Sequence, residues 1–260
     1  MDLGLKGSSA LVTGSTAGIG FAVAGKLAAE GCSVYLNGRS PERVAEAREK
    51  LLKEQPDADL RAAAGDLSTD AGTAAVLEAA PEVDIVVHNA ATYGSPPFFE
   101  IEDEEWRRKF ETNVMSGVRL ARHHLKLMLA RNSGRIVFLG SDLSVTSSPF
   151  ALDYAVTKAA GLSLSRGLAE QTRGTAVTVN TVLAGATETE GFHRLATESG
   201  LAYDQFESMI LNEVVPASLV QRVARPQEVA STVAFIASPL ASLTNGAAVR
   251  CEGGAVRSFG

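Results

Sequence analysis

Tyr154 and Lys158 stand four residues apart in the segment LDYAVTKAAG (152–161). In an α-helix this spacing places both side chains on one face. A free phenol, with a pKa of about 10, is a poor acid–base catalyst at neutral pH, and a nearby ammonium lowers that pKa by stabilising the phenolate. We therefore expect the pair to exchange a proton with a carbonyl or an alcohol oxygen.

Ser141 ends an apolar run at 134–141, thirteen residues before Tyr154. A hydroxyl at this place can hold a substrate oxygen and stabilise the charge that develops on it. Parallel sheets bind ligands at the carboxyl ends of their strands, so the end of a strand is a suitable position for such a group.

The segment TGSTAGIG (13–20) lies between an expected strand and an expected helix. Glycines in such a turn let the backbone approach a pyrophosphate, and the helix N-terminus that follows favours negative charge. A bare structural turn is the alternative, but the strand-turn-helix context favours a dinucleotide. The predicted contacts are Gly14, Ser15, Thr16, Ala17, Gly18, Ile19 and Gly20.

The end of the second expected strand indicates which dinucleotide is bound. NAD-binding proteins usually carry an acid there, for the ribose 2′-hydroxyl, but this chain has Asn37, Arg39 and Ser40. A guanidinium and a hydroxyl suit a 2′-phosphate, which a carboxylate would repel. We expect NADP(H), with NAD(H) as the alternative if Arg39 is only a solvated surface residue.

Short apolar runs alternate with longer Ala-rich segments along the chain. Such strands are typical of a parallel sheet covered on both faces, so we expect an α/β, Rossmann-type, doubly wound sheet of about seven strands. Expected strands cover 9–14, 33–38, 60–66, 83–91, 134–141, 177–185 and 247–254, and expected helices cover 19–31, 40–56, 69–80, 103–131, 152–173 and 225–238. Ser40 followed by Pro41 is a strong helix-start signal.

Composition excludes several classes of protein. The chain has 260 residues, 45% of them hydrophobic, and a formal charge of −6, so we expect one soluble domain over 1–260 that binds neither nucleic acid nor membrane. No signal peptide is expected, so the expected location is the cytoplasm. Cys32 and Cys251 lack metal-ligand spacing, and we expect no metal site.

The segment 186–224 breaks the strand–helix rhythm and is longer than an ordinary connection. Long connections in compact folds are often lids or binding loops, so we expect it to cover the substrate, with an ordinary helical hairpin as the alternative. Leu143, Phe150 and Phe192 are candidate walls of the substrate pocket.

Five features, in this order along the chain, resemble the short-chain dehydrogenase/reductase family: TGSTAGIG (13–20), HNAA (88–91), Asn113, Ser141 and YAVTK (154–158). The resemblance covers essentially the whole chain and is nearest to 3-oxoacyl-(acyl-carrier-protein) reductase-like members. It implies an NADP(H)-dependent oxidoreductase interconverting a ketone or aldehyde and an alcohol. An NAD(H)-dependent sugar or secondary-alcohol dehydrogenase is the alternative, and a non-catalytic redox sensor is a more distant one.

The resemblance also assigns roles to residues. Tyr154 matches the general acid/base, Ser141 the carbonyl-orienting serine, Lys158 the residue that lowers the tyrosine pKa and binds the nicotinamide ribose, and Asn113 the residue that holds a water-linked proton relay. Ser144 is a rival serine, but its spacing to Tyr154 is short for the family. Further cofactor contacts implied by the family are Asp66, Leu67, Asn89, Ala90, Ala91, Gly185, Thr187 and Thr189.

Two positions depart from the family pattern. Ala91 stands where a glycine is usual, and Ala184 precedes Gly185 where a proline is usual. Without the proline φ is no longer fixed, which leaves the loop after the sixth strand less constrained. The resemblance further implies a homotetramer, or a dimer, built through the long helices.

Overall fold

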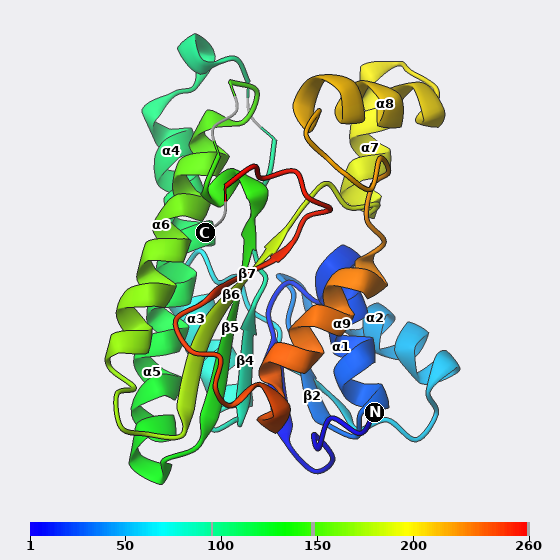
Figure 1. Ribbon diagram of the computed structural model, residues 1–260. Helices are drawn as coiled ribbons and strands as arrows, with labels where there is room; N and C mark the ends of the chain where they lie inside the picture. Colours follow the sequence, from blue (N-terminus) through cyan, green and yellow to red (C-terminus); the bar gives the residue numbers. More distant parts are fainter. Residues whose placement is uncertain (95, 147–148, 259–260) are drawn as a thin grey trace.

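A single seven-stranded parallel sheet organises the computed structural model, which describes residues 1–94, 96–146 and 149–258 (Figure 1). Neighbouring strands follow the order β3-β2-β1-β4-β5-β6-β7. The strands are Ser9–Val12 (β1), Ser33–Leu36 (β2), Leu60–Ala62 (β3), Ile85–His88 (β4), Gly134–Ser141 (β5), Val177–Ala184 (β6) and Ala248–Cys251 (β7). All seven expected strands are present, and the doubly wound fold is confirmed.

Helices cover both faces of the sheet, which explains why the strands are apolar throughout. One face carries α1 (Gly18–Ala29), α2 (Pro41–Glu54) and α9 (Pro226–Ala237), and the other carries α3 (Asp70–Ala79), α5 (Ser116–Arg131) and α6 (Leu152–Glu170) (Figure 1). Each face has its own buried apolar core. Within the described residues, no helix combines the length and the apolar character needed to cross a bilayer.

Local signals set the helix ends as the sequence predicts. Ser40 caps α2 by accepting the Arg43 N–H at 3.3 Å, and Pro41 is the first helical residue. Thr69 caps α3 in the same way, accepting the Gly72 N–H at 3.0 Å. These side chains satisfy backbone donors that have no partner inside the helix.

The expected helix at 103–131 is helical throughout but not uniform. It consists of α4 (Asp103–Phe110), a π-helical turn (Glu111–Met115) and α5. The wide turn holds Asn113, and such turns are common at functional sites. The spacing of apolar residues does not reveal the π-helical turn, because the helical pattern continues on both sides of it.

The segment 186–224 forms a helical pair beyond the end of the sheet, on the opposite side from α4 (Figure 1). Its helices are α7 (Glu190–Ser199) and α8 (Tyr203–Met209), followed by a π-helical turn (Ile210–Val214). A small core of its own holds Phe192, Ala196, Phe206 and Val223. Elsewhere in the described residues, short 3-10 turns lie at Phe98–Glu100, Asp142–Ser144 and Pro239–Ala241.

Candidate active site

Ser141, Tyr154 and Lys158 meet where α6 packs against the carboxyl end of β5. The Ser141 hydroxyl lies beside the Tyr154 phenol and acts to lower its pKa. Lys158 Nζ lies 5.5 Å from the centre of the Tyr154 ring and donates a 2.6 Å hydrogen bond to the Leu139 carbonyl. Ser141 and Lys158 are buried and Tyr154 is half-buried, and the short distance from Lys158 Nζ to the Tyr154 ring places both side chains on one face of α6.

The pKa of the Tyr154 phenol is raised, whereas the sequence led us to expect a lowered pKa. Burial is the main cause, because a phenolate would lose its hydration there, and Tyr93 and Asp142 add to the effect. Burial also lowers the pKa of Lys158 to about 8. The Tyr154 phenol is therefore protonated at neutral pH, as a proton donor to a carbonyl must be.

The geometry supports Ser141 over Ser144 as the serine that faces Tyr154. Ser144 Oγ accepts the Ser141 N–H at 3.1 Å and so holds the backbone of Ser141 in place. Ser141 Oγ donates to Asp142 Oδ1 at 2.7 Å and accepts the Leu143 N–H at 3.2 Å. Sequence reasoning missed Asp142, a carboxyl whose pKa is raised by burial, although it directly follows Ser141 in the chain.

Asn113 ties the connection after β4 to α6. Its Oδ1 accepts the Thr92 N–H at 2.7 Å, and its Nδ2 donates to the Thr92 carbonyl at 3.1 Å and to Thr157 Oγ1 at 2.9 Å. The side chain is buried, and Thr157 neighbours Lys158 on α6. Asn113 therefore lies beside α6, and its place in a proton relay remains a prediction.

The glycine turn has the backbone conformation that a pyrophosphate cradle needs. Gly14 and Gly18 have φ values of +59° and +56°, which residues other than glycine rarely adopt. A Cβ at Gly20 would overlap the Gly14 carbonyl oxygen and lie 2.5 Å from Asn89 Nδ2. The residues present fit a bound dinucleotide.

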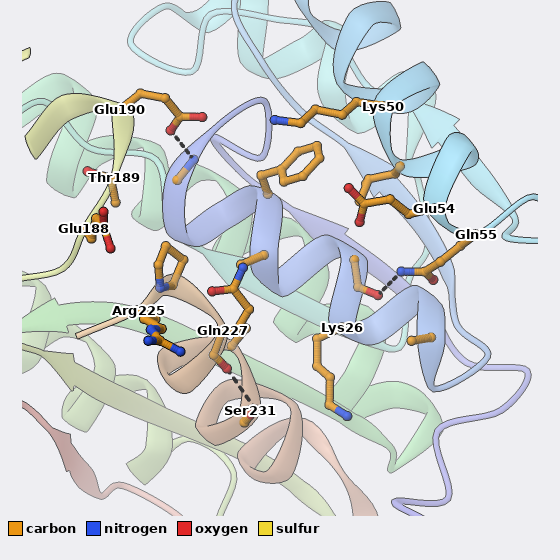
Figure 2. Close-up of a pocket in the computed structure, with 18 of the residues that line it drawn as sticks. Lys26, Lys50, Glu54, Gln55, Glu188, Thr189, Glu190, Arg225, Gln227 and Ser231 are labelled. Carbon is orange, nitrogen blue, oxygen red and sulfur yellow. Dashed lines mark hydrogen bonds between the residues drawn. The ribbon is translucent and has the colours of Figure 1, made fainter. Parts of the chain in front are cut away.

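The first turn of α1 is in contact with a carboxylate side chain of the protein itself. The Gly18 N–H donates a 2.9 Å hydrogen bond to Glu190 Oε2, which comes from the first residue of α7 (Figure 2). A free N–H at a helix N-terminus attracts a carboxylate for the same reason that it attracts a phosphate. This contact supports the predicted pyrophosphate site.

The two candidate residues Asn37 and Arg39, at the end of β2, differ in their burial. Asn37 is buried, and its side chain accepts the Gly14 N–H at 3.1 Å and donates to the Ala63 and Gly65 carbonyls. It therefore holds the glycine turn in place. Arg39 is exposed and directly follows Gly38, which packs against Thr16 of this turn, so its guanidinium is accessible to a nucleotide phosphate.

The other predicted cofactor residues lie around the same edge of the sheet. Asn89 Nδ2 donates to the Thr13 and Gly14 carbonyls, Asp66 Oδ1 accepts from Ser68, and Leu67 is buried in the core. Ala90 is partly buried and Ala91 is exposed. Thr187 Oγ1 donates to the Gly185 carbonyl at 2.8 Å, and Thr189 caps α7. Their contacts with the cofactor remain predictions.

The substrate side includes a residue that sequence reasoning missed. The Tyr93 ring meets the Tyr154 ring edge-on, with centroids 4.8 Å apart. Of the candidate walls, Leu143 is half-buried next to Ser141, and Phe150 is 66% exposed. Phe192 instead packs inside the helical pair, 5.0 Å from the Phe206 ring. No local pattern marks Tyr93, because its position depends on the fold of the β4 connection.

A hollow of about 710 Å³ lies on the outer side of α1, between α2, α9 and the start of α7 (Figure 2). Gly18 and Glu190 line one end of it, and Lys50, Glu54 and Gln55 line the α2 side. Ser141, Tyr154 and Lys158 do not line it. The hollow adjoins the glycine turn and is separate from these three side chains.

Comparison with known proteins decides the family. A sequence profile of the short chain dehydrogenase family matches residues 8–200. This chain belongs to the short-chain dehydrogenase family. It is similar over 262 residues, at 44% identity and with 99% of each chain covered, to YvaG of Bacillus subtilis (strain 168), an uncharacterized oxidoreductase.

Further relatives cover nearly the whole of this short-chain dehydrogenase. The 3-oxoacyl-[acyl-carrier-protein] reductase FabG of Escherichia coli (strain K12) is 32% identical over 256 residues, covering 97% of this chain and 98% of the relative. The structure of L-sorbose reductase from Gluconobacter frateurii, complexed with NADPH and L-sorbose, matches with a TM-score of 0.91 at 31% identity and 100% coverage of both chains. A 3-oxoacyl reductase from Agrobacterium tumefaciens C58 with NADP bound matches with a TM-score of 0.86 at 28% identity, covering 97% of this chain and 96% of the other.

Gly20→Ala should lower the free energy of unfolding of this short-chain dehydrogenase by about 2 kcal/mol, because the added methyl overlaps the Gly14 carbonyl. Urea titration followed by circular dichroism measures the change. Gly191→Ala is the matched control, since a Cβ at that position on α7 would make only ordinary contacts and alanine favours a helix. Equal stability of the two variants would contradict the tight packing of the turn.

Glu190→Gln should tighten NADPH binding about fivefold, because the carboxylate at the Gly18 N–H competes with the pyrophosphate, a contact of about 1 kcal/mol. Isothermal titration calorimetry gives the two dissociation constants. Glu54→Gln, which removes a charge at the far side of the same hollow, should leave affinity unchanged. Weaker binding by Glu190→Gln would show that Glu190 helps to hold the cofactor.

Proposed function

We propose that this protein is an NADP(H)-dependent oxidoreductase that interconverts a ketone or aldehyde and an alcohol. The observation that carries the proposal is that Ser141 lies beside the Tyr154 phenol and that Lys158 Nζ lies 5.5 Å from the centre of the same ring. A bound NADP(H) supplies or accepts the hydride. Among the residues of this chain, Ser141 holds the substrate oxygen and Tyr154 gives it a proton, or takes one from an alcohol.

Lys158 and Asn113 support the proton transfer. As Tyr154 loses its proton, the Lys158 ammonium stabilises the negative charge on the phenol oxygen. Asn113 holds the connection after β4 against Thr157, next to Lys158. Both residues keep the phenol oriented toward Ser141, and the family's relay through Asn113 is part of this proposal.

Two observations support NADP(H) over NAD(H). Arg39 is exposed beside the glycine turn, at a position where an acid would repel a 2′-phosphate. The solved relatives named above contain NADPH or NADP. An NAD(H)-dependent sugar or secondary-alcohol dehydrogenase is the alternative.

The substrate class has two candidates. Similarity to FabG supports a 3-oxoacyl compound, whereas the L-sorbose reductase supports a sugar ketone. A redox sensor without catalysis would need no general acid beside a serine. We include in the proposal that α7 and α8 cover the substrate and that residues 1–260 form one domain.

The proposed assembly is a cytoplasmic homotetramer, or a dimer. The outer face of α6 supports close packing of another subunit, because Ala159 is exposed and open space surrounds Gly161 and Gly167. Light scattering during size-exclusion chromatography tests the assembly. A monomeric mass would contradict it.

A cofactor-paired screen tests the function. L-sorbose, acetoacetyl-coenzyme A and ethyl acetoacetate are offered with NADPH or NADH, and the matching alcohols with NADP+ or NAD+, while absorbance at 340 nm is followed. We expect NADPH-dependent reduction of at least one ketone. NADPH binding with no turnover of any compound would favour the sensor and contradict the proposal.

The kcat/KM for ketone reduction should be level up to about pH 7 and fall above about pH 8. The lowered pKa of Lys158, about 8, means that its ammonium is present below that pH and is lost above it. The raised pKa of Tyr154 keeps the phenol protonated through this range, so the fall reports Lys158. A level profile up to pH 10 would contradict this reading.

A further inference from the structure

One ion pair in the described part of the chain has both side chains fully buried. Lys109 of α4 and Asp153 of α6 are each 0% exposed, and Lys109 Nζ donates a hydrogen bond to Asp153 Oδ2. The other ion pairs within that part of the chain each keep at least one partly exposed partner, as Arg250 does beside Glu252. Burying two charges costs hydration free energy, which their attraction offsets only in good geometry.

Asp153 acts directly on the start of the catalytic helix. Its Oδ1 accepts the Tyr154 N–H at 2.7 Å. The residue before α6, Ala151, makes no side-chain capping bond, although the first N–H groups of a helix need acceptors from outside the helix. Asp153 supplies one of these acceptors, and its negative charge suits the N-terminal turn.

Lys109 connects this helix start to a third segment. Its Nζ also donates to the Gly94 carbonyl at 2.6 Å. Gly94, with a φ of +95°, directly follows Tyr93, whose ring meets the Tyr154 ring edge-on. One ammonium therefore joins α4, the first turn of α6 and the connection after β4.

We propose that the buried pair of Lys109 and Asp153 positions Tyr154. The pair fixes the first turn of α6 and holds Tyr93 against the phenol ring, which keeps the phenol oxygen within reach of Ser141. Lys109 and Asp153 act through Tyr154 rather than on the substrate, so they are positioning residues. The inference rests on the proposed function in one respect, that Tyr154 is the proton donor.

The double variant Lys109→Met/Asp153→Asn tests the proposal. It removes both charges together, so no lone charge is buried, and the asparagine oxygen still accepts the Tyr154 N–H. We expect a melting temperature and an NADPH affinity close to those of the parent. The kcat for ketone reduction should fall about 100-fold with little change in KM, because a small displacement of a catalytic group costs about that much.

Arg107→Met is the matched control, since it breaks an exposed ion pair with Asp103 on the same helix and should leave kcat unchanged. The single variants Lys109→Met and Asp153→Asn should lower kcat at least as far as the double variant. A double variant with the kcat of the parent would overturn the proposal and leave the pair a purely structural role. A loss of NADPH binding together with kcat would also overturn it.

Amide hydrogen exchange with NADPH bound needs no turnover. In the double variant, exchange should become faster in peptides covering 152–158 and 92–94, and stay as in the parent in α1 and α9. Unchanged exchange at 152–158 would overturn the positioning role. If the parent turns over no ketone and exchange at 152–158 is still faster in the double variant, the positioning role is supported. Only the proposed function is then contradicted.

Discussion

Tyr154→Phe should lower kcat for ketone reduction about 1,000-fold and leave the affinity for NADPH within about twofold of the parent. The substitution removes one oxygen atom and keeps the ring, so the packing against Tyr93 and Lys158 is retained. Only the proposed proton donor to the substrate oxygen is lost. Stopped-flow measurement of NADPH oxidation, together with calorimetric titration of NADPH, separates the two quantities.

Tyr93→Phe is the matched control for this experiment. It removes the neighbouring phenol oxygen and keeps the edge-on contact with Tyr154. Because Tyr93 raises the pKa of Tyr154 only as a secondary effect, its variant should keep most of the activity. Turnover that survives in Tyr154→Phe, or disappears equally in both variants, would mean that another group delivers the proton.

Arg39→Ala should weaken NADPH binding about 30-fold and leave NADH binding unchanged. A hydrogen bond from Arg39 to the 2′-phosphate of NADPH contributes about 2 kcal/mol. NADH has no 2′-phosphate, so its binding does not depend on this bond. Arg39 is exposed beside the turn that Asn37 holds, so its removal disturbs no buried contact. Calorimetric titration with each cofactor measures the effect.

Lys53→Ala removes the same charge from the exposed last turn of α2 and serves as the control. It should leave both affinities unchanged. Arg39→Asp should go further than Arg39→Ala, because an acid at this position suits the free ribose 2′-hydroxyl of NADH. Equal affinity of the parent and Arg39→Ala for NADPH would assign the 2′-phosphate to other residues and reopen the choice of NAD(H).

Much of the fold was predictable because short-range physics decides it. The Ser40–Pro41 start of α2 depends on one hydroxyl, one ring and the backbone next to them. The seven strands were predictable because a parallel sheet buried on both faces needs apolar residues at every position. The i, i+4 pairing of Tyr154 and Lys158 follows from helix geometry alone.

The pKa of Tyr154 was not predictable in the same way. From the sequence, a lysine one turn away should lower it. In the structure Lys158 donates to the Leu139 carbonyl, and burial dominates the phenol. The direction of the shift depends on how much water reaches the oxygen, which the whole packing of β5, α6 and their neighbours decides.

Which chemical groups this protein has, and which local turns and helices carry them, can be read from the sequence alone. These are the glycine turn at 13–20, Ser141 at a strand end, and Tyr154 with Lys158 on one helix face. Only the tertiary structure brought Glu190 to the Gly18 N–H and Lys109 to Asp153. These partners are 172 and 44 residues apart in the chain. Local conformation depends on residues within one or two turns of backbone. A contact between distant segments forms only when the helices pack on the sheet, and this packing also decides how deeply the contact is buried and therefore how strong it is.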